Sequence, residues 1–253
     1  MKILHCAKND ITENSGHIYI RDRRQVHHLK NVLRLRLGER LVVCSGGQKY
    51  CGRICALSPE RISMNIDTGE ENRQDNRPLL AIACAVPKNA RMDDIVDKLT
   101  QLGVARIIPL WTQRTIVRWN NQQTKRRLLR WQRIARSAAE QCGRPDLPKI
   151  DNVTPLRKIL ENEQLLNSHP LRLIPALCLG RRRGIWPYLN KTQNQIKKTM
   201  ILIGPEGDWA PEEVALARQK RFIPVSLGDL VLRVDTAAVA VASLFSLCII
   251  SRG

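Results

Sequence analysis

Negative charge is scarce in this chain of 253 residues, which holds 23 Asp and Glu against 42 Lys and Arg and has a net charge of +19. A surplus of this size favours a polyanionic partner, because each phosphate that a cation neutralises releases counterions. A merely soluble basic surface is the weaker interpretation, since the positive charge is clustered along the chain.

Long apolar runs are also missing. The longest, from 237 to 250, is broken by Ser243 and Ser246 and is too short to span a bilayer. The first eight residues lack the apolar segment of a secretory signal. We therefore expect a cytoplasmic protein with no membrane partner, in which 237–250 forms a buried helix.

No Cys-x-x-Cys pair occurs among the eight cysteines. Cys51 and Cys55 lie downstream of His27 and His28, but their spacing matches no standard zinc pattern. Buried free thiols in a reducing cytoplasm account for these cysteines better. We expect no metal site.

The first 70 residues are predicted to form a small β-barrel domain. Short stretches rich in β-branched residues alternate there with turn signals such as Gly46-Gly47 and Ser58-Pro59. One helix, at about 24–33, interrupts them. The expected strands are 16–20, 39–44, 50–56 and 61–66.

A polar linker, 71–78, separates this domain from the rest of the chain. From 79 to 253, strands alternate with helices, which predicts an α/β domain with a largely parallel sheet. The continuous apolar run 79–86 is typical of a strand covered on both faces. Further strands are expected at 104–109, 171–179, 199–203 and 222–227, and helices at 92–102, 125–141, 211–219 and 236–250.

Between Asp97 and Glu140 the chain has no acidic residue. On a helix, Arg126, Arg130 and Arg133 would share one face. Such a run is commonly a solvated helix face, but solvated helices usually mix charges of both signs, and Arg binds phosphate through its bidentate fork. The stretch therefore indicates nucleic-acid binding. From residue 106 onward its cations are Arg106, Arg114, Arg118, Lys125, Arg126, Arg127, Arg130, Arg133 and Arg136.

Two glycine turns near the carboxy terminus suggest a ligand pocket. The apolar run 201–203 stops at Gly204-Pro-Glu-Gly207, and 225–227 stops at Gly228. Glycine lets a ligand approach the main chain, and neighbouring strand ends often build one pocket. A plain turn before a helix that begins with Pro211 also explains the first motif.

Arg233 follows the second turn and precedes the predicted buried helix. A charge in this place is costly without a partner. Arg233 could pair with a structural partner, Asp235 or Glu206, or it could contact the substrate directly. The sequence supports the two interpretations almost equally.

Several segments stand in a fixed order along nearly the whole chain. They are 25–34 with Leu37-Gly38, 88–92 with 98–104, 109–114, 131–141 with Gly143-Arg144, 204–207, and 226–228 with Leu232-Arg233. In this order they resemble the RsmE family, the bacterial 16S ribosomal RNA uridine-N3 methyltransferases of the SPOUT class. No single motif is decisive, but their joint order is highly specific.

The resemblance implies a PUA-like barrel that helps to hold RNA, followed by a SPOUT-type α/β domain whose carboxy-terminal segment forms a trefoil knot. It also implies S-adenosylmethionine as cofactor, a homodimer, and methylation of N3 of a specific uridine in the 16S ribosomal RNA of the small subunit. Two alternatives stay open: a non-catalytic factor that binds ribosomal RNA or assists ribosome assembly, and a methyltransferase for another RNA position.

The resemblance and the charge pattern together nominate the site residues, with the proton acceptor left open among a backbone carbonyl, Glu206 and water. Expected catalytic residues are Arg233, Arg114 and Glu206, with Arg144 as an alternative second cation. Expected cofactor-binding residues are Leu179, Ile203, Gly204, Glu206, Gly207, Leu227, Gly228 and Leu232. Expected RNA-binding residues are Arg34, Lys88, Arg91, Arg114, Arg118, Arg126, Arg130, Arg133 and Arg144.

The chain also departs from the family pattern. Asp208 stands where a second glycine is usual, Val234-Asp235 where Thr-Glu is frequent, and Gln101 where the family has Glu. Ala210 replaces the Ser that would cap the following helix, which removes a hydrogen bond worth about 1 kcal/mol. Asp tolerates a left-handed backbone, and its carboxylate could lie near the sulfonium of the implied cofactor, but its side chain can also narrow the loop.

Overall fold

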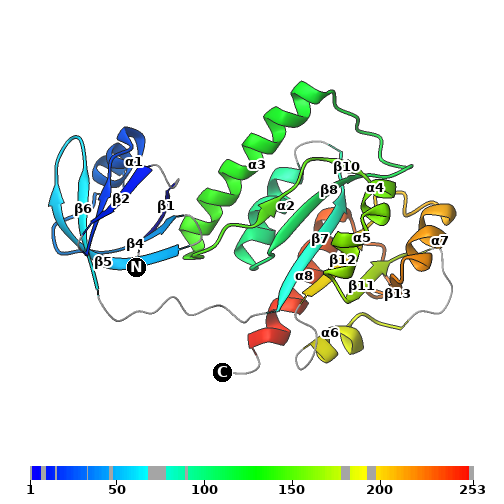
Figure 1. Cartoon of the computed structure of the whole chain (residues 1–253). Helices are drawn as coiled ribbons and strands as arrows, with labels where there is room; N and C mark the ends of the chain where they lie inside the picture. Colours follow the sequence, from blue (N-terminus) through cyan, green and yellow to red (C-terminus); the bar gives the residue numbers. More distant parts are fainter. Residues whose placement is uncertain are drawn as a thin grey trace. The chain divides into compact units, whose positions relative to one another are not determined.

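The computed structural model describes residues 2–6, 10–14, 16–32, 34–45, 48–67, 78–88, 91–177, 183–192 and 198–250. The chain divides into two compact units (Figure 1). The amino-terminal unit comprises Met1–Asp75 with Ala139–Asp146, and the carboxy-terminal unit comprises Asn76–Ala138 with Leu147–Gly253.

The amino-terminal unit is built on one sheet of six strands, ordered β1-β4-β5-β6-β3-β2. All neighbours are antiparallel except β1 and β4, which run parallel. A β-bulge between Ile54 and Ala56 interrupts the register of β5 against β6. The strands are β1 (Lys2–Cys6), β2 (Ile11–Asn14), β3 (His17–Ile20), β4 (Arg40–Ser45), β5 (Gln48–Leu57) and β6 (Ile62–Ile66).

The core of this unit lies under a short helical segment. The helix α1 (Arg23–His27) continues as the π-helical turn η2 (His28–Val32), and the side chains of Val26 and Leu29 are buried against the sheet. Asp22 caps α1 by accepting a hydrogen bond from the Gln25 N–H at 2.8 Å. The predicted helix and four strands are present, whereas β1 and β2 were not predicted.

Residues 139–146 were predicted as part of the second domain but are counted in the amino-terminal unit. His5 of β1 explains why. Its backbone N–H donates to Glu140 Oε1 at 3.2 Å, and its ring Nε2 lies 3.0 Å from the Arg144 carbonyl oxygen. These contacts tie the end of the long helix α3 (Asn121–Cys142) to β1.

The carboxy-terminal unit contains a parallel sheet with the order β10-β8-β7-β12-β11-β13, and β9 also pairs with β8. All of its ladders are parallel, as predicted. Six residues of β7 are no more than 2% exposed, which is what a strand covered on both faces requires. The strands are β7 (Leu79–Ala85), β8 (Arg106–Trp111), β9 (Lys149–Ile150), β10 (Thr154–Pro155), β11 (Leu171–Pro175), β12 (Lys198–Ile203) and β13 (Ile223–Val225).

Helices cover both faces of this sheet. One face packs against α2 (Arg91–Gln101), α3, α6 (Trp186–Thr192) and α8 (Val234–Ile250). The opposite face packs against α4 (Leu156–Glu161), α5 (Glu163–Asn167) and α7 (Pro211–Gln219). The result is a three-layer α/β/α arrangement. Within the described residues, no helix is both long and apolar enough to cross a membrane.

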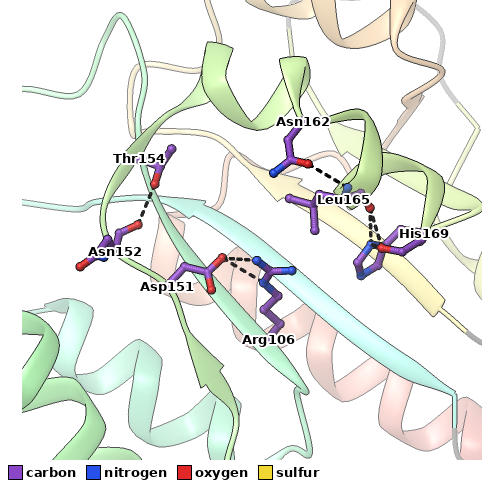
Figure 2. Close-up of polar contacts among 8 residues, drawn as sticks. Arg106, Asp151, Asn152, Thr154, Asn162, Leu165 and His169 are labelled. Carbon is purple, nitrogen blue, oxygen red and sulfur yellow. Dashed lines mark hydrogen bonds and ion pairs between the residues drawn. The ribbon is translucent and has the colours of Figure 1, made fainter.

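Polar contacts fix the segment between β8 and β11 (Figure 2). Arg106 of β8 donates from Nε and Nη2 to Asp151 Oδ2, at 2.9 and 2.7 Å. Asn162 caps α5 by accepting from the Leu165 N–H at 2.9 Å, and the Leu165 carbonyl lies 2.8 Å from His169 Nδ1. Arg106, one of the cations in the acid-free stretch, therefore has a structural partner.

Candidate functional site

A pocket lies at the carboxyl ends of β11, β12 and β13. It encloses about 560 Å³, part of which is open to solvent. The sequence predicted two neighbouring strand ends, but β11 lies between β12 and β13, so three loops form the walls. Its lining includes Pro175, Ala176, Leu177, Ile203, Gly204, Pro205, Glu206, Asp208, Val225, Ser226, Leu227, Gly228, Leu230, Val231, Leu232, Val234 and Ala237.

Gly204 is needed for a reason that the sequence did not reveal. A Cβ built on it would lie 2.9 Å from Nε1 of Trp209, which is closer than real Cβ contacts come. Trp209 is fully buried and donates from Nε1 to the Pro175 carbonyl oxygen at 2.8 Å. The close approach predicted for a ligand at this glycine is made by the Trp209 indole.

Asp208 adopts the left-handed backbone conformation, with φ of 58°. Its N–H donates to the Pro205 carbonyl at 2.9 Å, which closes the turn, and its Oδ2 accepts from the Leu177 N–H at 3.0 Å. The side chain thus joins the loop after β12 to the segment after β11. The residue that departs from the family pattern therefore connects two segments that line the pocket.

Arg114 supports the same loop from the other side. Its Nη1 donates to the Gly207 carbonyl oxygen at 2.5 Å. The preceding residue is held by buried Glu213, whose Oε1 accepts from the Gln113 N–H at 2.8 Å and whose Oε2 accepts from the Ala210 N–H at 3.1 Å. Glu213, at the third position of α7, therefore satisfies the backbone N–H of the N-cap residue Ala210, whereas the alanine side chain accepts no hydrogen bond from the first turn.

Glu206 lines the pocket, and its Oε1 lies 3.9 Å from Nη1 of Arg91 on α2. Both side chains are about one-third exposed, so this ion pair is a weak one. Arg91, predicted to bind RNA, is directed toward a carboxylate of the pocket.

Arg233 lies beside the pocket, between the lining residues Leu232 and Val234. Its Nε is 3.6 Å from Asp235 Oδ1, which is too long for a hydrogen bond, and its side chain is 61% exposed. Among the described residues, that buried Asp235 oxygen has no hydrogen-bond partner. Asp235, not Glu206, is therefore the structural neighbour of Arg233.

The loop after β13 depends on Gly228, whose φ of 123° is unfavourable for other residues. The Ser226 hydroxyl accepts from the Gly228 N–H at 3.2 Å and donates to the Gly228 carbonyl at 3.0 Å. Ser226 also forms a parallel bridge with Gly184. This wall of the pocket is built by local hydrogen bonds.

The α3 arginines differ in their surroundings. Arg130 donates from Nε to Asp93 Oδ2 on α2 at 2.7 Å, so one of the three predicted phosphate ligands is paired with a carboxylate from another helix. Arg126 and Arg133 are exposed, and no acidic side chain pairs with either within the described part of the chain. Arg127 lies over the Trp119 ring, 4.1 Å from its centroid.

Arg118, Arg34 and Lys88 are exposed. Arg118 donates from Nη2 to the Thr112 carbonyl at 2.9 Å and lies over the Trp111 ring. Arg34 has a left-handed backbone with φ of 48°.

Arg144 differs from these three, because it is 8% exposed and donates from Nη2 to Asp146 at 2.6 Å within the amino-terminal unit. Its burial and ion pair give it a structural role there, and a role in binding RNA stays a prediction.

Of the predicted cofactor-binding residues, six line the pocket: Ile203, Gly204, Glu206, Leu227, Gly228 and Leu232. Gly207 is absent from the lining, but its carbonyl oxygen accepts the hydrogen bond from Arg114. Leu179 lies outside the described residues. The prediction missed Asp208 as a lining residue, together with Leu230 and Val231. Asp208 was expected as a departure from the family pattern whose carboxylate could lie near the cofactor's sulfonium, and Leu230 and Val231 lie between two residues that were predicted, Gly228 and Leu232.

Within the described residues, no group of three or more His, Cys, Asp and Glu could hold a metal ion. Cys51 is buried and Cys55 is exposed, and neither belongs to such a group. Burial raises the pKa of the Cys84 thiol to about 12 and that of Cys44 to about 11, so neither is a ready thiolate.

Comparison with known proteins gives consistent matches. Residues 74–246 match the model of an RNA methyltransferase domain, and 20–63 match that of an RNA methyltransferase PUA domain. The ribosomal RNA small subunit methyltransferase E of Synechocystis is 34% identical over 88% of this chain and 71% of its own, and the Bacillus subtilis protein of that name is 28% identical over 88% and 87%. The crystal structure of that enzyme from Neisseria gonorrhoeae, bound to S-adenosyl methionine, is 27% identical, with a TM-score of 0.75 over 96% of both chains.

Proposed function

The chain belongs to the RNA methyltransferase family of ribosomal RNA small subunit methyltransferase E, and on this premise we propose that it methylates N3 of a specific uridine in 16S ribosomal RNA. It is an RNA methyltransferase that uses S-adenosylmethionine, with a parallel-sheet catalytic unit and a PUA-like amino-terminal sheet. The observation that carries the proposal is the pocket at the ends of β11, β12 and β13, beside Arg233.

The pocket has the chemistry that this cofactor requires. It is a concave site lined mostly by apolar side chains with a few polar groups, as small-molecule sites generally are. Ile203, Leu227 and Leu232 would offer apolar contacts to the cofactor, and Glu206 adds a carboxylate to the lining that would attract its positive charge. When bound, the cofactor supplies a methyl group activated by its sulfonium.

Because the methyl group is already activated, the protein needs mainly to align N3 of the uracil with it, and alignment can supply roughly 7–11 kcal/mol in the best cases. As N3 loses its proton, negative charge spreads over the uracil carbonyl oxygens. We assign Arg233 to stabilise that charge, since its exposed guanidinium is beside the pocket and only loosely paired with Asp235.

Glu206 is the residue that we propose as acceptor of the N3 proton, because its carboxylate lines the pocket and, among the described residues, its one ion pair is the 3.9 Å contact with Arg91. Arg114 acts differently from the first expectation. Its guanidinium donates a hydrogen bond to the Gly207 carbonyl, and we therefore propose that it positions the loop after β12 at the cofactor pocket.

RNA would be held by the exposed cations of α3, above all Arg126 and Arg133, through phosphate contacts. The target uridine must be unpaired or turned out of its stack, since N3 lies on the edge that base pairing covers. Small-subunit ribosomal RNA is the partner in the names of the relatives.

We further propose that the enzyme is a homodimer with a knotted carboxy-terminal segment, as the family resemblance implies. Leu230 and Val231 at the pocket mouth are 79% and 68% exposed, which suits a surface that a second copy covers. Sedimentation equilibrium tests the dimer: a monomer at all concentrations would reject it.

Two measurements test the function as a whole. Calorimetric titration with S-adenosylmethionine should give saturable heat, whereas a non-catalytic RNA-binding factor would give none. Mass spectrometry of 16S ribosomal RNA from cells that lack the protein should show one uridine without its N3 methyl group. A methyl group lost at another position, or in another RNA, would change the substrate that we propose.

A further inference from the structure

Asp208 stands in a backbone conformation that glycine usually provides. Its φ of 58° lies in the left-handed region, which Asp and Asn enter more readily than other residues with a side chain. Its N–H donates to the Pro205 carbonyl at 2.9 Å. The turn therefore needs the conformation but not the carboxylate, and the carboxylate is left to serve another purpose.

The carboxylate of Asp208 binds the backbone of Leu177. Oδ2 of Asp208 accepts from the Leu177 N–H at 3.0 Å, and both residues line the pocket. The next residue along the chain, Trp209, donates to the Pro175 carbonyl at 2.8 Å. Two consecutive residues after β12 thus bind the last residue of β11 and a residue of the segment that follows it. Of these two bonds, the one made by Asp208 joins two residues that both line the pocket.

We propose that Asp208 is a positioning residue of the cofactor pocket, whose carboxylate ties the segment after β11 to the loop after β12 and so sets the pocket before the cofactor binds. This inference rests on the proposed function, in which the pocket takes S-adenosylmethionine. A pocket held in its binding shape loses less conformational entropy when it is filled. A glycine at 208 would keep the turn but not the tie.

Three variants separate the effect of the hydrogen bond between Asp208 and Leu177 from that of the left-handed backbone at 208 and from that of the negative charge. Asp208→Gly keeps the left-handed turn and removes the acceptor, whereas Asp208→Asn keeps an acceptor oxygen and tolerance of that conformation. Asp229→Asn removes a negative charge from the exposed loop after Gly228 and is the control. Amide hydrogen exchange at Leu177 in the cofactor-free protein reports the tie directly.

For Asp208→Gly we expect faster exchange at Leu177 and a KM for the cofactor raised roughly 5- to 10-fold, as loss of one hydrogen bond predicts. The kcat should change little, because the tie acts on binding rather than on the transferred group. Asp208→Asn and Asp229→Asn should match the wild type in exchange at Leu177 and in KM.

Unchanged exchange and KM in Asp208→Gly would overturn the inference. An Asn variant as weak as the Gly variant would also overturn it, because charge rather than the hydrogen bond would then be responsible. Wild-type protein that binds no S-adenosylmethionine would instead reject the proposed function, while exchange at Leu177 still decides whether the tie exists.

Discussion

The side chain of Arg114 binds the main chain of the loop that joins β12 to α7. Its Nη1 donates to the Gly207 carbonyl oxygen at 2.5 Å. The two residues are far apart in sequence, and Glu213 fixes the main chain next to Arg114 through the Gln113 N–H. The loop between β12 and α7 is thus supported by Arg114 on one side and tied to Leu177 by Asp208 on the other.

Arg114→Ala should weaken cofactor binding by roughly 5- to 10-fold, because the Gly207 carbonyl loses its charged donor. Gln113→Ala is the matched control, since Glu213 binds the backbone of Gln113 and not its side chain. Calorimetry with S-adenosylmethionine measures both variants. Equal affinities in Arg114→Ala and the wild type would remove the positioning role.

Arg233→Ala should lower kcat about 10²- to 10³-fold, as removal of one donor to a developing negative charge does. The affinity for RNA should stay close to that of the wild type, because one exposed arginine adds little to a surface with many cations. Methyl transfer under single-turnover conditions and a filter-binding assay separate the two effects. Turnover at the wild-type rate would sink the assignment of Arg233.

Replacing Arg126 and Arg133 by Ala should weaken RNA binding. The slope of log K for RNA binding against the logarithm of the salt concentration should become shallower by about 0.7–0.9 for each phosphate contact that is lost. Arg157→Ala is the control, because this arginine of α4 is also exposed but pairs with Glu161. Binding is measured over a range of salt concentrations. A slope that does not change would mean that this face of α3 only contacts solvent.

Gly204→Ala should destabilise the carboxy-terminal unit by about 1–3 kcal/mol, because the new Cβ would press on the buried Trp209 indole. Gly207→Ala should cost less, since its Cβ would meet only ordinary contacts, 3.6 Å from Arg114. Urea denaturation compares the two variants. Similar midpoints would contradict the steric role of Gly204.

His169 should make the protein less stable in acid. Its burial lowers the pKa of the imidazole below the ordinary 6.5, so the unfolded state binds more protons below that pH. The free energy of unfolding should therefore fall as the pH drops from about 6.5 toward 5. His169→Gln should show less of this fall than the wild type, with the exposed His27→Gln as control. Equal pH profiles for wild type and His169→Gln would contradict it.

The long, strongly patterned elements were predictable from the sequence. The observed bounds of β7 and α2 lie within one residue of the predicted ones, because a continuous apolar run marks a buried strand and an apolar stripe every three to four residues marks an amphipathic helix. The bounds predicted for α7 are those observed, with Pro211 at its first position. The short elements were missed: β1, β2, β9, β10, α4, α5 and α6. Their stability comes from tertiary packing rather than from local preference.

The sequence by itself determined the α/β class and the basic character of α3, because composition and local pattern carry that information, and its resemblance to a known family gave six residues of the pocket. Only the tertiary structure decided which of the α3 arginines are paired with a carboxylate. Asp93 reaches Arg130 from another helix, so a stretch without acidic residues in sequence is not without them in space. It also decided that β11 separates the two glycine turns and that Asp208 binds Leu177, since these pairings join residues that no local pattern connects.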